Sequence, residues 1–360
     1  MGFVQAELDV QTSAVCIAVL LFRLDGLLFG LLVVSLFFNF FIGLHFRAGQ
    51  STMPCLHKAL SLAATFCETL QDFMETENID KSQGWKNILK IIIPYFLSVG
   101  LFALIAFYLV GLDIANYKTI QQTTEQRFII TFFSLLGTWA VIWLFREYID
   151  KKTFTSLGFD KSFLIKDISI GLAFGFVIML IGFTCLLFTK QIIFLNIQFK
   201  PIELMLSVGI FIFVAISEEL FLRGYVLNNL LVSFNKYIAL LISSLLFSLM
   251  HGANPNFSLI SFIGLFIAGL FFGLSYIFTR SLWFPIALHF GWNFFQGTIF
   301  GFNVSGKDTY SLIVTENNAL NIWNGGDFGF EGSILSIILQ LIAIFIILII
   351  FKNRLKTGDY

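Results

Sequence analysis

Long apolar runs separated by short polar connections dominate the pattern of this chain. A helix needs about 20 apolar residues to cross the roughly 30 Å hydrocarbon core of a bilayer. Eight runs approach that length, and they cover about 91–111, 128–145, 168–188, 203–226, 237–251, 257–279, 283–301 and 334–351. The pattern therefore predicts an all-α, polytopic membrane protein with about eight transmembrane helices.

The first 73 residues differ from the rest of the chain. Two further apolar stretches, about 13–22 and 26–46, are separated by charged residues and would add one or two helices at the N-terminus. Met74 opens a charged stretch of the kind that precedes a first membrane helix. We therefore expect residues 1–73 to be an accessory extension, or the result of a start codon assigned too early.

Composition strengthens the membrane interpretation. Apolar residues make up 58% of the 360 residues and charged residues only 12%, against roughly a quarter charged in soluble proteins. Such a chain has too little polar surface to cover a water-soluble domain of this size. Twenty-two Lys and Arg balance twenty-two Asp and Glu, so no net charge points to nucleic acid. We expect the lipid bilayer to surround the protein.

The positive charges are distributed unequally between the two sides of the predicted helices. From Met74 onward, alternating connections carry 14 Lys and Arg on one side and 5 on the other, and cytoplasmic loops hold such an excess. The richer side includes the tail after 351, which predicts a cytoplasmic C-terminus in a multi-pass protein of the cell membrane. The poorer side holds one long polar connection, about 302–333, which is expected to fold over the outer face.

Three of the predicted helices carry ionisable groups, each of which costs on the order of 2.5–3.5 kcal/mol near the centre of a bilayer. Such residues are rare in membrane helices and mark functional sites. The segments are Ser217-Glu218-Glu219-Leu220-Phe221-Leu222-Arg223, Phe247-Ser248-Leu249-Met250-His251 and His289-Phe290-Gly291-Trp292-Asn293.

Helical geometry separates the two glutamates. Glu219 and Arg223 are four residues apart, share one face and are expected to form an ion pair. Glu218 lies about 140° from Arg223 around the helix and is left to face another partner. His289 and Asn293 are also four residues apart and present an imidazole and an amide from one face.

The depth of these residues in the membrane follows from the helix lengths. If the fourth and fifth helices form an antiparallel hairpin that turns near 233–235, Glu218 and His251 lie at one level, roughly 20–25 Å from the turn. Polar residues place the turn in the cytoplasmic interface, so the site lies roughly 10–15 Å below the hydrocarbon edge and opens to the cytoplasm. His289 and Asn293 reach a similar depth.

The order of these motifs on membrane helices resembles the CPBP family of intramembrane proteases. That family includes the type II CAAX prenyl proteases and bacterial relatives of lysostaphin-resistance and bacteriocin-immunity proteins. The resemblance runs through 218–223, 247–251 and 289–293, within a domain of about 165–305. It implies a catalytic core there, with first transmembrane helices at 74–164. The rest, 306–360, comprises the outer loop, the last helix and the cytoplasmic tail.

The resemblance implies a glutamic-type endopeptidase that needs no metal and no cofactor. Glu218 and His251 would activate water, and His289 and Asn293 would donate to the oxyanion. Glu219 and Arg223 would support the site. The residues agree with this division, because peptide hydrolysis needs a base and oxyanion donors. A covalent nucleophile is disfavoured, since no GxSxG motif, Ser-Lys pair or aligned Cys-His is present.

Other interpretations stay open at this point. The ionisable groups are also compatible with buried helix contacts, and Phe247 is expected to be a packing residue. Glu218, His251 and His289 are chemically able to bind Zn²⁺, although HExxH is absent. Glu and His within a membrane also suit a proton-coupled transporter or a non-enzymatic scaffold. The expected substrate is a membrane-associated peptide or protein, and composition does not show whether it is prenylated.

Overall fold

We analysed a computed structural model, which describes residues 82–112 and 122–351. The predicted N-terminal helices within 1–73 lie outside the described residues. The chain divides into two compact units, Met1–Lys86 and Asn87–Tyr360. Of the first unit, only the residues from Ser82 onward are described, and they form the start of the first described helix.

The second unit is mostly helical. Its α-helices are α4 (Ser82–Leu109, shared with the first unit), α5 (Thr124–Leu144), α6 (Leu164–Phe188), α7 (Pro201–Glu219), α8 (Asn228–Ser233), α9 (Lys236–Met250), α10 (Leu259–Thr279), α11 (Trp283–Asn293) and α12 (Ile334–Ile350). Three π-helices extend α5, α7 and α11, namely η2 (Phe145–Ile149), η4 (Leu220–Leu227) and η5 (Phe294–Ile299). Short 3₁₀ turns, η3 (Phe154–Leu157), η6 (Gly326–Phe328) and η7 (Phe330–Gly332), lie in the connections.

Five of the described helical segments are long and apolar enough to cross a membrane: Ser82–Leu109, Thr124–Ile149, Leu164–Phe188, Pro201–Ser233 and Leu259–Thr279. The helical character of all eight predicted runs is confirmed. Two of them, α9 and α12, are shorter apolar helices of 15 and 17 residues. Helix α11 has 11 residues before its π-helical continuation. The count of about eight spans therefore stays a prediction.

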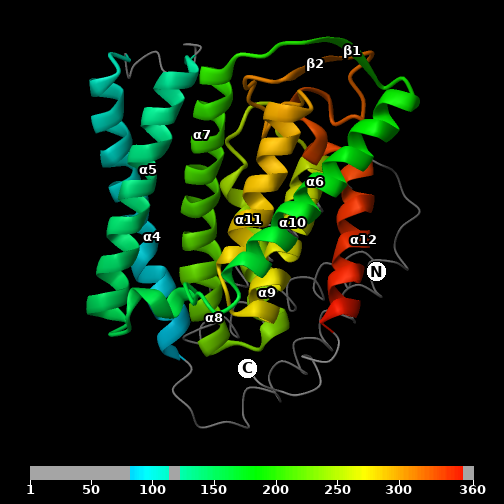
Figure 1. Cartoon of the computed structure of the whole chain (residues 1–360). Helices are drawn as coiled ribbons and strands as arrows, with labels where there is room; N and C mark the ends of the chain where they lie inside the picture. Colours follow the sequence, from blue (N-terminus) through cyan, green and yellow to red (C-terminus); the bar gives the residue numbers. More distant parts are fainter. Residues whose placement is uncertain (1–81, 113–121, 352–360) are drawn as a thin grey trace, which may run out of the picture. The chain divides into compact units, whose positions relative to one another are not determined.

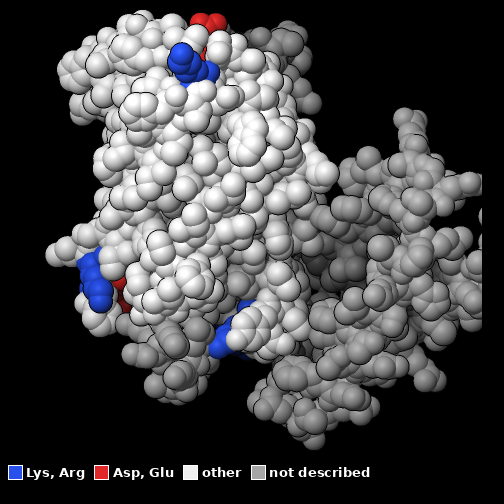
Figure 2. Space-filling view, turned by 90° about the vertical axis from the view of Figure 1, so that its right-hand side faces the viewer, with Lys and Arg blue, Asp and Glu red and all other residues white. Residues whose placement is uncertain are grey.

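Large apolar side chains cover the outside of these helices. Leu97 on α4 is 68% exposed and Phe345 on α12 is 63% exposed, which would be unfavourable in water. On the face drawn in Figure 2, a broad belt without charged residues separates charges at the two ends. Lipid is the natural solvent for such a belt.

Close backbone contacts join the helices that carry the motifs. A Cβ atom on Gly171 of α6 would lie 2.7 Å from the Leu288 nitrogen of α11, and one on Gly175 would lie 2.7 Å from Gly291. A Cβ atom on Gly269 of α10 would lie 2.8 Å from Ser244 of α9. Only glycine permits such approaches, and small residues at helix contacts are typical of membrane proteins.

A two-stranded antiparallel sheet caps one end of the bundle (Figure 1). Strand β1 (Ile192–Ile197) follows α6, and β2 (Ile313–Asn317) lies in the polar connection between η5 and α12. The register shifts between Phe194 and Asn196, which marks a β-bulge. Helix α7 begins at this end and α8 ends at the opposite one (Figure 1).

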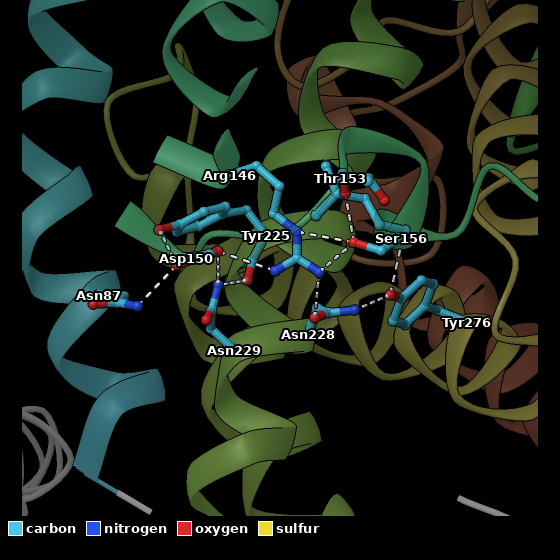
Figure 3. A network of polar contacts seen from close by, with 10 residues as sticks. Asn87, Arg146, Asp150, Thr153, Ser156, Tyr225, Asn228, Asn229 and Tyr276 are labelled. Carbon is cyan, nitrogen blue, oxygen red and sulfur yellow. Dashed lines mark hydrogen bonds and ion pairs between the residues drawn. The ribbon is translucent and has the colours of Figure 1, made fainter. Parts of the chain in front are cut away.

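A second group of polar residues forms a hydrogen-bond network near α8 (Figure 3). Arg146 of η2 is buried and donates to Asp150 Oδ2 at 3.0 Å and to Ser156 Oγ at 2.8 Å. Asp150 also accepts from Asn87 at 2.8 Å and from Tyr225 at 3.3 Å. This network ties α4 and the end of η2 to η4.

Candidate active site

The glutamate pair lies where α7 changes into a π-helix. Helix α7 begins with Pro201 at its first turn, where the missing N–H is not needed. It ends at Glu219, and the wider π turn carries Arg223. Arg223 Nη1 donates to Glu219 Oε1 at 2.7 Å, and both side chains are fully buried. The predicted ion pair is confirmed, although the regular α-helix assumed for it is not present beyond Glu219.

Glu219 has a second hydrogen-bond partner. His289 of α11 donates from Nδ1 to the same Glu219 Oε1 at 2.8 Å. Arg223 Nη2 donates to the Gly269 carbonyl of α10 at 3.1 Å. The buried Glu219 carboxylate therefore joins α7, η4 and α11. The Arg223 guanidinium connects this group to α10. This fixes the ring orientation of His289, whose Nε2 atom points away from Glu219.

Glu218 faces the two histidines, as the helical geometry predicts. Its Oε2 atom lies 3.7 Å from His251 Nε2 and 4.0 Å from His289 Nε2. Neither distance is a hydrogen bond, and Oε2 is a buried atom without a hydrogen-bond partner in the described part of the chain. Glu218 Oε2 therefore lies close to two imidazole nitrogens without a hydrogen bond to either of them.

The backbone determines which nitrogen of His251 carries a proton. His251 follows the last residue of α9, and its Nδ1 lies 2.8 Å from the Phe247 carbonyl oxygen. A carbonyl oxygen only accepts, so Nδ1 is the donor and Nε2 of the neutral ring presents its lone pair to Glu218. A water between Glu218 Oε2 and His251 Nε2 would donate one proton to each.

Asn293 lies at the last residue of α11, one turn beyond His289. Its side chain is 5% exposed, and within residues 82–112 and 122–351 it makes no hydrogen bond. The structure therefore brings Glu218, His251 and His289 together, whereas the role of Asn293 beside them stays a prediction.

Two aromatic rings form a support beneath the histidines. Phe247 lies 4.8 Å from the His251 ring, and Phe272 of α10 stacks on His289 at 5.0 Å. The Arg223 guanidinium lies over both rings, 4.7 Å from Phe247 and 5.3 Å from Phe272. Sequence reasoning missed Phe272, because one phenylalanine in an apolar helix carries no signal of its role. Phe247 packs as predicted.

The arrangement can be compared with a metal centre. Among the described residues, no group of three or more His, Cys, Asp and Glu side chains has the geometry of a metal site. His289 uses Nδ1 for Glu219 and His251 uses Nδ1 for a carbonyl, so only their Nε2 atoms remain to bind anything near Glu218. A carboxylate beside an acceptor imidazole is able to hold a water molecule.

These features define a polytopic helical membrane protein with a buried Glu and His site. Residues 200–295 match the family model of type II CAAX prenyl endopeptidase Rce1-like proteins. The matched segment contains Glu218, His251, His289 and Asn293, and it confirms the resemblance to CPBP-family proteases. The family implies a protease. No curated protein and no solved structure matches the chain.

Proposed function

We propose that this protein is an intramembrane endopeptidase that cleaves a membrane-associated peptide or protein with water activated by Glu218 and His251. The observation that carries the proposal is the position of Glu218 Oε2, buried and unpaired 3.7 Å from His251 Nε2. A carboxylate and an acceptor imidazole at this spacing are able to accept hydrogen bonds from both O–H groups of one water. Base catalysis of this kind contributes about 10²–10⁴ in rate.

The proposed reaction begins with that water. Its oxygen attacks the carbonyl carbon of the scissile bond while Glu218 takes a proton. The carbonyl oxygen becomes an oxyanion, which accepts hydrogen bonds from Asn293 Nδ2 and from His289 Nε2. Because His289 Nδ1 already donates to Glu219, Nε2 donates only when the ring carries both protons. The oxyanion then re-forms the carbonyl group, the C–N bond breaks and Glu218 passes its proton to the leaving amine. One peptide ends in a new carboxyl group and the other begins with a new amino group.

The supporting residues act through His289 in this proposal. Glu219 orients the imidazole, and Arg223 neutralises Glu219 in a place where an unpaired carboxylate would be costly. Phe247 and Phe272 keep both rings in place. None of these four needs to touch the substrate.

We also propose the finer features of topology. The eight helical segments cross or enter the bilayer, with the core at 165–305 and a cytoplasmic C-terminus in the cell membrane. The bias in Lys and Arg supports this orientation. An opening of the site toward the cytoplasm stays a prediction.

Comparative peptidomics tests the proposed function in cells. Membranes from cells that produce wild-type protein should contain cleavage products that are absent when Glu218→Gln protein is produced. Glu147→Gln is the matched control, because Glu147 is an exposed glutamate outside the site. Equal peptide sets from wild type and Glu218→Gln, at equal protein abundance, would contradict the proposal.

A further inference from the structure

The position of Glu218 is set by the helix that carries it rather than by contacts of its own. Its Oε2 atom lies 3.7 Å from His251 Nε2 and makes no hydrogen bond within the described residues. Glu219, in contrast, is held by its ion pair with Arg223 and by His289. A base must lie within hydrogen-bond reach of the proton that it takes, and a misplacement of about 1 Å is able to cost about 10²-fold in rate. Whatever holds the backbone near Glu218 therefore sets its distance to His251.

The backbone that follows the two glutamates is the π-helix η4. All 8 of its residues, Leu220–Leu227, are buried. π-Helices are rare, and they occur mostly as single-turn insertions in α-helices, frequently at functional sites. The shape of such a turn depends on hydrogen bonds and packing from the elements around it.

Ser243 of α9 supplies one of these hydrogen bonds. Its Oγ atom donates to the Leu222 carbonyl oxygen of η4 at 3.2 Å, and the residue is 1% exposed. A serine inside a helix is able to bond to the carbonyl four residues earlier in its own helix. The neighbouring Ser244 does this, with its Oγ atom 2.7 Å from the Leu240 carbonyl oxygen. Ser243 instead connects α9 to a different element.

This hydrogen bond joins the two segments that supply the proposed water-activating pair. Leu222 lies four residues after Glu218, and Ser243 lies eight residues before His251. Four residues make about one helical turn, and α9 continues without interruption from Ser243 to Met250. A displacement of η4 relative to α9 would therefore change the distance between Glu218 and His251.

Asp150 holds the end of the same π-helix (Figure 3). The Tyr225 hydroxyl of η4 donates to Asp150 Oδ1 at 3.3 Å. Asn229, which follows η4, donates from Nδ2 to Asp150 Oδ2 at 3.4 Å and to the Tyr225 carbonyl oxygen at 3.0 Å. The end of η4 is therefore fixed by this carboxylate, whereas its first turn, which lies closer to Glu218, is joined to α9 by Ser243.

We propose that Ser243 is a positioning residue for the proposed reaction: its hydrogen bond to Leu222 holds η4 against α9 and so sets the spacing between Glu218 and His251. The inference rests on the proposed function, because it concerns the water that these two side chains would hold. Ser243 acts through the backbone and need not touch the substrate. Its loss should therefore lower the rate of the chemical step rather than the affinity for the substrate.

Ser243→Ala and Ser244→Ala form a matched pair, because each removes one buried hydroxyl from adjacent positions of α9. The probe is a palmitoylated octapeptide in lipid vesicles, selected from a degenerate library by its cleavage with wild-type protein. Ser243→Ala should lower kcat by about 10–100-fold with little change in KM, whereas Ser244→Ala should keep the wild-type kcat. A folded Ser243→Ala protein with the wild-type kcat, or an equal fall in both variants, would overturn the inference and leave the proposed function standing.

Hydrogen exchange of the η4 amides measures the hold of Ser243 without catalysis. The amides of Leu220–Leu227 should exchange about 2–10-fold faster in Ser243→Ala than in wild type or Ser244→Ala, the range for the loss of one neutral hydrogen bond. Unchanged exchange would overturn the inference even if cleavage slows. Faster exchange, in a protein whose wild type cleaves no peptide of the library, would refute the proposed function and the positioning role with it, while confirming that Ser243 holds η4.

Discussion

Replacing Glu219 by Leu removes the acceptor that Arg223 and His289 share. The change leaves the guanidinium with the Gly269 carbonyl at 3.1 Å and two aromatic faces, but without the carboxylate of its ion pair. Its Nε atom already lacks a partner among the described residues. His289 loses its only acceptor at Nδ1. The variant therefore disturbs both the stability of the core and the orientation of a proposed oxyanion donor.

The magnitude follows from the complete burial of the pair. Breaking a buried ion pair by removing one partner costs about 3–5 kcal/mol, because the remaining charge stays buried. Replacing both charges by apolar residues of similar size is often close to neutral. Glu219→Leu alone should therefore be strongly destabilising, whereas Glu219→Leu combined with Arg223→Met should recover most of the lost stability.

Catalytic activity should not follow stability in this double-mutant cycle. The double variant restores a well-packed core, but His289 still lacks the carboxylate that orients it. We expect a stable protein with turnover reduced by about 10²-fold, the lower range for the loss of one oxyanion donor. If Glu219 had only a structural role, the double variant would instead regain activity together with stability.

The stability of the detergent-solubilised variants is measured by thermal unfolding, which is followed by size-exclusion chromatography with fluorescence detection. At about 2–4 °C per kcal/mol, Glu219→Leu should lower the Tm by roughly 6–20 °C. Their turnover is measured by the hydrolysis of a cleavable peptide in vesicles. The reasoning is refuted if the single variant keeps the wild-type Tm, or if the double variant regains full turnover.

Three further predictions concern the rest of the site. Asn293→Leu fills similar space and should lower kcat by about 10²–10³ with little change in KM; a well-folded variant with wild-type turnover would remove Asn293 from the site. EDTA and 1,10-phenanthroline should leave the activity of purified protein unchanged, and a loss that Zn²⁺ restores would instead identify a metal enzyme. Burial raises the pKa of Glu331, so the native state retains a proton that the unfolded chain has lost; stability should fall as pH rises from the ordinary carboxyl pKa through the raised one. Glu331→Gln should flatten this dependence, and an identical slope in urea unfolding of both proteins would count against it.

The motif residues were predictable because their chemistry conflicts with their surroundings. Glu218, Glu219, Arg223, His251 and His289 stand out as ionisable groups in apolar helices, where each is costly. Helical spacing was enough to pair Glu219 with Arg223 and to leave Glu218 for another partner. The positions of the helices followed from the same apolar runs.

Features that depend on tertiary contacts were not predictable in this way. The π-helix after Glu219 follows no local pattern in Leu220–Leu227, and hydropathy does not distinguish it from an α-helix. Phe272 resembles every other apolar residue of α10 until its ring is seen against His289. The turn at Gly306 packs against Pro255, about fifty residues earlier in the chain, and no local pattern predicts this contact.

The central claim is that Glu218 is the base that activates water, and the rate of peptide cleavage by purified Glu218→Gln protein tests it most directly. Gln keeps the volume of the side chain but has no basic oxygen, so folding and the Tm should be maintained. Under single-turnover conditions in vesicles, the rate should fall by at least 10²-fold relative to wild type and to the Glu147→Gln control. A folded Glu218→Gln protein that retains more than about a tenth of the wild-type rate would contradict the claim.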